Sequence, residues 1–482
     1  MSDAVRGLLD GVRVINLGVA GFGDAVEATG APLVRMEWRP PADGDPELDR
    51  VLRTIESAPA HGAYRSVGEA NRAVARELID AEPWLVDVVP AARAMPVFAE
   101  HPKLLLHAGP PMVWEEMTGP MRGAVAGAAL YEGWVNEAPE AERQAAAGEI
   151  AFRPCHDAGA VGPMGGITSP SMPVLVVENR TRGNRGYCIL NEGIGRVLRF
   201  GANGPDVVER LNWMRDVLGP ALGAAARAAG GIDLRGITAR AITMGDEFHQ
   251  RNIAASALFL RAIAPWLEEV DVSASRRSEV LRFLGATEQF FLNVAMAYGK
   301  VSVDAARTIR AGTVVTTMTR NGVRFGVRLS GTGDRWFTAP VNTPRGIYFA
   351  SFDEADGNPD IGDSAVTETI GWGGCAMAAA PGVIRFLGAG GFADAVDITR
   401  SMADVCVASN PHFLLPTLDF EALPVGLDAM RVVELGVEPI INTGIAHRQA
   451  GIGQVGAGTV RAPLACFRAA LRGYAETLEA HQ

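Results

Sequence analysis

Polar and small residues gather between Met318 and Met377, which makes this stretch the first candidate for chemistry. Arg320 and Asn321 precede a turn at Gly331 and Gly333, whose exposed amides suit an anionic or sugar-like ligand. Carboxylates and a hydroxyl follow, and such groups bind Mg²⁺ or act on the protons of a substrate amide. The alternative is an Asp-rich loop that caps a helix at Ser364. These further candidates are Asp334, Asp360, Asp363, Ser364 and Glu368.

A second group of polar residues lies in the segment Met244–Asn252. Its pattern predicts the start of an amphipathic helix that runs to about Leu260. Arg251 and Asn252 can bind a carboxylate or carbamoyl group directly, and His249 is a candidate proton-transfer group. Alternatively, an Asp residue caps this helix and the histidine is solvated.

Two more histidines lie in glycine-rich loops. His156 is part of the loop Cys155–Gly166, whose backbone could approach a phosphate or carboxylate. His447 precedes another glycine-rich stretch and is a candidate acid/base group. Each could equally be a packed or solvated loop residue.

Several common mechanisms are not indicated. The first glycine loop, Gly18–Gly23, has the spacing GxxGxG rather than the GxGxxG of dinucleotide-binding proteins. The sequence has no GxSxG, no GxxxxGK[ST] and no HExxH, so serine hydrolase, P-loop and zincin chemistry is not expected. We predict no certain cofactor, with Mg²⁺ as the one candidate metal.

Charge and cysteine usage set the class of protein. The 44 basic and 55 acidic side chains give a net charge of -11, which argues against nucleic-acid binding. The five cysteines show no CxxC spacing, and we find no signal peptide and no apolar run long enough for a membrane span. We therefore expect a cytoplasmic protein, assembled as a homo-oligomer.

The elements that would position these residues indicate an α/β fold. Strands near 12–17, 33–38, 84–89 and 103–107 alternate with helices, including one over 67–80, and predict a Rossmann-like parallel sheet. A mainly helical middle module and an α+β C-terminal domain follow, with one helix expected over 278–300. The predicted domains are 1–150, 151–204, 205–305 and 306–482.

Long, unusual strings resemble one known family. They include LLHAGPPMVWEEMTGP (105–120), GPMGGITSPSMPV (162–174), MGDEFHQRN (244–252), MTRNGVRFGVRLSGTGDRWFTAP (318–340) and PDIGDSAVTETIGWGGCAMAAAP (359–381). Together they are similar to the YlbE-like family, once catalogued as a domain of unknown function. The resemblance extends from about Asn16 to the C-terminus.

The resemblance implies a subunit of a carbamoyltransferase from allantoin or purine breakdown, which works beside an FdrA-like partner. Its substrates would be a small ureido acid of the oxalurate or oxamate type and phosphate or carbamoyl phosphate. We expect Asp360, Asp363, His447 and His249 to be catalytic, and the remaining candidates named above to bind substrate. The alternatives are a non-catalytic scaffold subunit and a nucleotide-dependent ligase of the acyl-CoA synthetase type.

Overall fold

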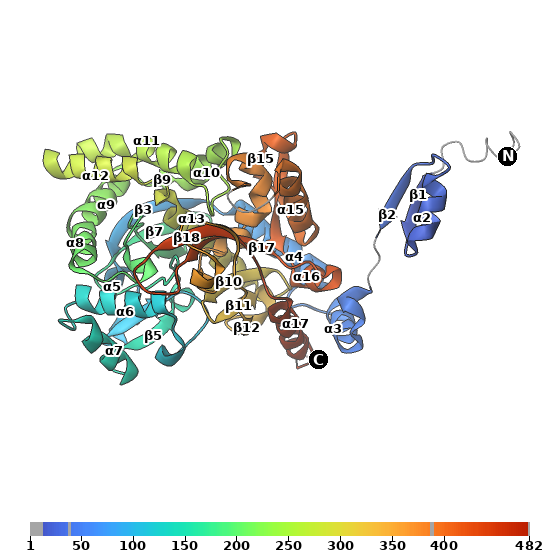
Figure 1. Cartoon of the computed structure of the whole chain (residues 1–482), viewed down its shortest axis with the longest axis horizontal. Coiled ribbons are helices and arrows are strands. Elements are labelled where there is room, and N and C mark those ends of the chain that lie inside the picture. The colour runs from blue at the N-terminus through green and yellow to red at the C-terminus, as the bar shows by residue number, and fades with distance from the viewer. Residues whose placement is uncertain (1–12, 37–39, 386–389, 481–482) are drawn as a thin grey trace, which may run out of the picture.

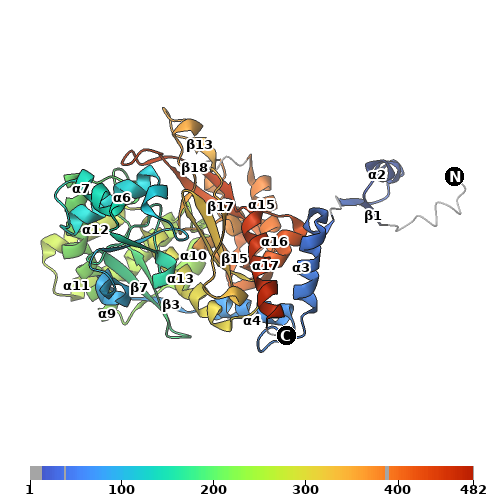
Figure 2. The ribbon, with the colours of Figure 1, turned by 90° about the horizontal axis from the view of Figure 1, so that it is seen from below.

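The computed structural model describes residues 13–36, 40–385 and 390–480. A small N-terminal unit stands apart from the rest of the molecule in both views (Figures 1 and 2). It consists of strand β1 (Val14–Leu17), helix α2 (Ala20–Glu27) and strand β2 (Leu33–Met36), with the two strands paired in parallel. Apolar side chains of this unit, such as Ile15 and Phe22, are exposed.

The largest sheet has five strands in the order β6-β8-β7-β3-β9. Strand β3 lies antiparallel to both β7 and β9, and β7 and β8 form an antiparallel pair. The strands are β3 (Pro83–Pro90), β6 (Ala160–Val161), β7 (Pro173–Asn179), β8 (Arg185–Ile189) and β9 (Ile232–Asp233). Helix α13 (Phe290–Ala306) packs on β7 and β8. Strands β4 (Leu104–His107) and β5 (Ala151–Pro154) form a separate parallel pair.

Helices enclose this half of the molecule (Figure 1). They are α5 (Ala91–Ala94), α6 (Gly119–Tyr131), α7 (Ala138–Ala146), α8 (Pro205–Trp213), α9 (Gly219–Ala228), α10 (Leu234–Thr243), α11 (Ile253–Glu269) and α12 (Ala274–Ala286). Helix α4 (Val67–Asp80) packs on α13 and lies toward the C-terminal half of the molecule (Figure 1). Helix α6 is rich in Gly and Ala and is buried on most of its surface, so neighbouring backbone approaches it closely.

The C-terminal half contains three further antiparallel sheets. Strands β12-β11-β10-β14 form one, β13-β18-β17 the second and the hairpin β15-β16 the third. Their bounds are β10 (Val315–Asn321), β11 (Arg324–Leu329), β12 (Phe337–Pro340), β13 (Arg345–Tyr348), β14 (Ile361–Gly362), β15 (Cys406–Leu415), β16 (Glu421–Leu427), β17 (Ile440–Ala446) and β18 (Gln454–Arg461). The helices here are α3 (Pro46–Ser57), α14 (Val366–Thr369), α15 (Phe392–Asp404), α16 (Ala429–Leu435) and α17 (Leu464–Glu479).

The predicted mixed α/β class is confirmed, and the helix expected over 67–80 is α4. The predicted Rossmann-like parallel sheet is wrong, because the N-terminal strands belong to three different sheets. The apolar pattern located those strands but could not choose their partners, and β3 pairs antiparallel with residues far along the chain. The helix expected over 278–300 is broken at Thr287–Gln289 into α12 and α13. No helix among the described residues is long and apolar enough to cross a membrane.

Candidate functional site

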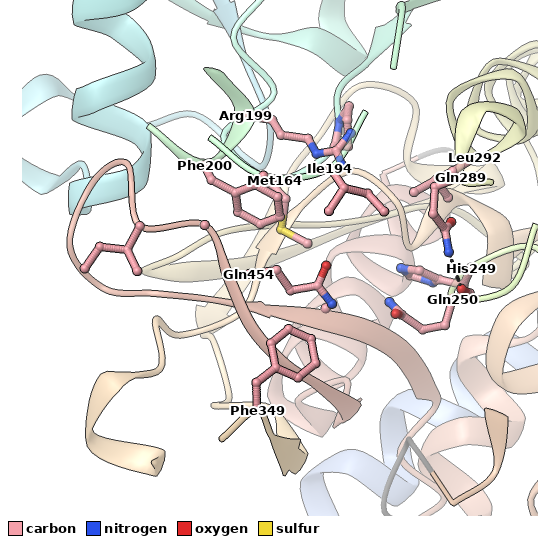
Figure 3. Close-up of a pocket in the computed structure, with 15 residues that line it drawn as sticks. Met164, Ile194, Arg199, Phe200, His249, Gln250, Gln289, Leu292, Phe349 and Gln454 are labelled. Atoms are coloured by element: carbon pink, nitrogen blue, oxygen red, sulfur yellow. Dashed lines mark hydrogen bonds between the residues drawn. The ribbon is translucent and has the colours of Figure 1, made fainter. Parts of the chain in front are cut away.

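A cavity of about 320 Å³ lies where five loops meet the first turn of α13 and strand β17. Two of the loops follow β6 and β13, one precedes the short helix at Leu198–Phe200, and two connect α10 to α11 and β17 to β18. This volume suits a small molecule rather than a polymer. Figure 3 shows Gln250 and Gln289 on one side of the cavity, with Gln454 facing them. The lining residues are Pro163, Met164, Ile194, Gly195, Arg199, Phe200, His249, Gln250, Gln289, Leu292, Phe349, Gly444, Ile452, Gly453 and Gln454.

The segment between α10 and α11 gives this cavity its histidine. The expected helix over 244–260 is wrong, because α11 begins only at Ile253 and residues 244–252 form a loop. Phe248 causes the difference: it is fully buried and adopts φ 70. A left-handed backbone is costly for a bulky side chain, and such strain concentrates at functional sites. Met164, which lines the same cavity, also has a positive φ of 54.

His249 lies against a buried carboxylate. Its Nδ1 is 2.8 Å from Oε1 and 3.1 Å from Oε2 of Glu368 in α14. A carboxylate accepts hydrogen bonds, so Nδ1 carries the proton in this pair and Nε2 of the neutral ring has a free lone pair. Because His249 lines the cavity, Nε2 is the nitrogen that a ligand there can reach. This arrangement is the usual one for an oriented general base.

Backbone and side-chain groups hold Glu368 in place. The amides of Gly374 and Asn442 donate to its Oε1 at 3.1 Å and 3.2 Å. Gly373 has φ 57, and a Cβ there would lie 1.9 Å from the same oxygen, so only glycine fits beside the carboxylate. The histidine is thus oriented by a carboxylate that cannot easily move.

A second buried acid fixes the loop itself. Glu247 accepts hydrogen bonds from the backbone amides of His249 and Arg251 and from Asn442 Nδ2. Burial raises the pKa of Glu247, and the neighbouring His249 opposes that shift. Asn442 therefore contacts both acids, one through its amide side chain and the other through its backbone.

One cation reaches the cavity from the opposite wall. Arg199 donates from its Nη1 to Asn191 Oδ1 at 3.0 Å and from its Nη2 to the Gly193 carbonyl at 2.9 Å. Asn191 in turn donates to the Gln289 carbonyl at 2.9 Å, which joins the arginine to the start of α13. Burial lowers the pKa of Arg199, while the charge of Glu192 raises it. A guanidinium held this way can bind a small anion through its remaining donors.

Carboxamide side chains supply most of the remaining polarity. Gln289 donates to the Gln250 carbonyl at 2.5 Å and accepts from Asn252 Nδ2 at 3.1 Å, so its amide orientation is fixed. Gln454 donates to the Gly456 carbonyl at 2.9 Å. Carboxamides both donate and accept, as the ureido group of a substrate does. The cavity therefore combines a base, a cation and amide partners.

Arg320 and Asp360 lie in a different environment. Arg320 is fully buried, and its Nε is 2.6 Å from Asp360 Oδ2. The other donors of the guanidinium bind Asp360 Oδ1, the Gly362 carbonyl, Ser364 and Thr443, which uses the whole donor set. The predicted residues Arg320, Asp360 and Ser364 are thus brought together, but they bind one another and do not line the cavity.

Asp363 connects three segments of the chain. Its carboxylate accepts from the amides of Gly109 and Gly162, each at 2.9 Å, and from the Thr319 hydroxyl. Burial raises the pKa of Asp363 to about 6, and these hydrogen bonds oppose the shift. His156 is also fully buried, with Nε2 at 3.6 Å from Asp363 Oδ1, and burial holds its pKa well below the usual value.

The other predicted residues are dispersed. Asn321 holds a turn by accepting from two backbone amides, and Asp334 is an exposed ion-pair partner of Arg307. His447 accepts from the Gln449 amide and lies 3.6 Å from Asp356. Arg251 lies 3.5 Å from Asp246. The glycines 331 and 333 are in the turn after β11, where a Cβ on Gly331 would meet Tyr474.

Of the predicted residues, His249 lines the cavity, and Glu368 and Asn252 support it from behind. The sequence interpretation missed Arg199, Gln250, Gln289 and Gln454 as site residues. Gln250 stands in the segment Met244–Asn252 and Gln454 in the glycine-rich stretch after His447, both of which the sequence singled out, whereas Arg199 gave no local signal. Among the described residues, no group of three or more His, Cys, Asp or Glu side chains could hold a metal ion.

Known proteins resemble this chain closely. Residues 150–364 match the family described as oxamate carbamoyltransferase subunit AllG. The protein of that name from Escherichia coli (strain K12) is 57% identical over 416 residues, which cover 86% of this chain and 99% of that protein. The uncharacterized protein YahG of the same strain is 41% identical over 465 residues, covering 96% of this chain and 97% of YahG.

A solved structure extends the likeness to the fold. A conserved protein of unknown function from Enterococcus faecalis V583 superposes with a TM-score of 0.84 at 43% identity, over 87% of this chain and 100% of that chain. The sequence identities and their coverage confirm the family inferred from the sequence strings. The chain belongs to the AllG family of oxamate carbamoyltransferase subunits.

Proposed function

We propose that this chain is the AllG-type subunit of an oxamate carbamoyltransferase and that it binds the ureido acid in the cavity around His249. The observation that carries the proposal is the pairing of His249 with Glu368, which leaves the far nitrogen of the ring at the cavity. The family relationship supplies the reaction class. The name of the E. coli relative includes the word subunit, so we expect partner chains, with an FdrA-like protein as our candidate.

The reaction is the transfer of a carbamoyl group between a nitrogen and a phosphate oxygen. With oxalurate, a phosphate oxygen attacks the carbamoyl carbon, forming a C–O bond, and the bond from that carbon to the oxamate nitrogen then breaks. One proton must leave the hydrogen phosphate and one must reach the departing nitrogen. His249 Nε2 would take the first and deliver it to the nitrogen, so oxamate and carbamoyl phosphate result without any net proton change.

The wall opposite the histidine would bind the negative end of the substrate. Arg199 matches the carboxylate of oxalurate, and the carboxamides of Gln250 and Gln289 match its ureido group. Glu368 would stabilise the histidine when it carries the proton, because the two side chains are buried and in contact.

The test is an assay of phosphate-dependent cleavage of oxalurate by the chain assembled with its partner subunits. His249→Gln should lower kcat by roughly 10²–10³-fold, with KM changed only a few-fold. The matched control is His61→Gln, a buried histidine that pairs with Tyr474 in another part of the molecule. His61→Gln should keep the kcat of the wild type. If His249→Gln also keeps more than about a tenth of that kcat, His249 is not the proton carrier.

A further inference from the structure

A second polar compartment is formed by the side chains of His156, Thr317, Arg328 and Trp336. Its floor is one face of the β10–β11 sheet, where Thr317 and Arg328 are directly opposed in register and so project to the same side. Its roof contains His156 and Trp336, whose rings meet edge to face at 6.1 Å. The Arg328 guanidinium lies 3.7 Å from the centre of the Trp336 ring.

Buried polar atoms without hydrogen-bond partners, most of them able to donate, are concentrated in this compartment. In the part of the chain that the structure describes, no hydrogen-bond partner is found for either ring nitrogen of His156, for Trp336 Nε1, for Thr317 Oγ1 or for the Nε atoms of Arg307 and Arg328. Indole and guanidinium N–H groups can only donate. Each buried donor left unpaired costs about 1–3 kcal/mol, so an acceptor group is expected among them.

The distribution of charge in the compartment also favours a bound anion. Lys300 and Arg328 are 0% and 2% exposed, whereas their carboxylate partners Asp304 and Asp157 are 21% and 34% exposed. Arg307 extends this pattern, because it bridges Asp304 to the exposed Asp334. In these three pairs the positive groups face inward and their carboxylate partners face solvent, which favours an anion inside. Asp363, 3.6 Å from His156, is a buried carboxyl at the edge of the compartment, and burial raises its pKa to about 6.

We propose that this compartment is a binding site for a small tetrahedral oxyanion, namely inorganic phosphate or the phosphoryl group of carbamoyl phosphate. The choice of phosphate rests on the proposed function, which involves two anionic reactants. Arg199 is the one lysine or arginine among the described residues that line the cavity around His249. The compartment supplies the cations that this cavity lacks. Asp363 and Gly162 connect the two sites through their 2.9 Å hydrogen bond.

The test is calorimetric titration of the full chain with inorganic phosphate, carbamoyl phosphate and, separately, oxamate. Trp336→Phe removes the Nε1 donor but keeps a ring beneath Arg328, and should weaken phosphate binding about tenfold. Arg328→Gln should weaken it by about tenfold to a hundredfold. Arg324→Gln is the matched control, because it removes an arginine–carboxylate pair from the same strand, with Glu116, away from the compartment. Its affinity for phosphate should be unchanged.

Arg199→Gln separates this inference from the proposed function. It should weaken the binding of oxamate and leave the binding of phosphate unchanged. Trp336→Phe and Arg328→Gln should weaken the binding of phosphate and leave that of oxamate unchanged. If Arg199→Gln removes phosphate binding while Trp336→Phe and Arg328→Gln leave it intact, both anions use one cavity and the second site is refuted, whereas the proposed function stands. Absence of phosphate binding at about 10 mM would overturn the inference too, because water would then satisfy the donors. The carbamoyl phosphate titration shows whether the phosphoryl group alone is recognised.

Discussion

The cluster around Arg320 and the site around His249 each contain an arginine and a buried carboxylate, but their polar atoms are used differently. In the Arg320 cluster, every guanidinium donor has an internal partner and the carboxylate of Asp360 is shared with Thr443. In the cavity, His249 uses one ring nitrogen internally, and Gln250 lines the open space. Arg199 uses part of its donor set on Asn191 and the Gly193 carbonyl and also lines the cavity. A polar cluster without spare atoms can hold loops together, whereas one with spare atoms beside a cavity can also bind a ligand.

The largest expected effect concerns the cluster around Arg320, in which every guanidinium donor has a partner. Arg320→Ala should lower the free energy of unfolding by about 3–5 kcal/mol, because it leaves Asp360 buried without its cation. Arg324→Ala, which removes a more exposed pair with Glu116, should cost less than about 1 kcal/mol. Urea denaturation of both variants measures the difference. Equal losses would mean that Arg320 does not stabilise the fold in the way its contacts suggest.

A second prediction uses pH. Burial raises the pKa of Asp363 from 3.8 to about 6, so between those values only the folded chain keeps the proton. Unfolding then releases a proton, and rising pH favours the unfolded state. The stability of the wild type relative to Asp363→Asn should therefore fall by about 3 kcal/mol between pH 3 and pH 7, of which about 2 kcal/mol is lost from pH 4 to pH 6, and then stay level above about pH 7.

The control for this pH series is Asn321→Ala, a change on β10 that adds and removes no titrating group. Its stability relative to the wild type should be constant over the same range. A level curve for Asp363→Asn as well would show that the carboxyl titrates alike in the folded and unfolded chain.

The smallest expected effect concerns Gln250 in the cavity around His249. Gln250→Leu replaces a carboxamide at the cavity by an apolar group of similar size, and should raise KM for the ureido acid by about tenfold. The free energy of unfolding should change by less than about 1 kcal/mol. Gln449→Leu, an exposed position after β17, serves as the control. A large loss of stability in Gln250→Leu would mean that this residue stabilises the fold, as the cluster around Arg320 does.

Sequence patterns located many of the strands and helices, because apolar periodicity and turn residues act locally. They did not predict which strands pair, since β3 joins β7 through contacts between residues about 90 positions apart. The same limit holds for the site. His249 and Glu368 were each singled out by local composition, but their contact spans 119 positions. Arg199 stands alone in an apolar stretch, and only the folded chain brings it to the cavity.

The loop 244–252 shows why a helix expected from local sequence can be wrong. Its polar pattern fits the first turn of a helix, yet buried Phe248 packs against Trp372 and Phe291 and turns the backbone into the left-handed region. Tertiary packing outweighs helix propensity here. The consequence is that His249 points to the cavity rather than along a helix surface.

Gly373 has a consequence for how natural variation in this family is interpreted. A change from glycine to alanine adds one methyl group and usually ranks among the mildest substitutions. Here that methyl group would occupy the place of the Glu368 carboxylate, 1.9 Å from its oxygen. A homologue with alanine at this position would have lost the orientation of its histidine while keeping every polar residue of the cavity. Under the proposed role of His249, the identity of this one glycine therefore distinguishes homologues that can keep the activity from those that retain only the fold.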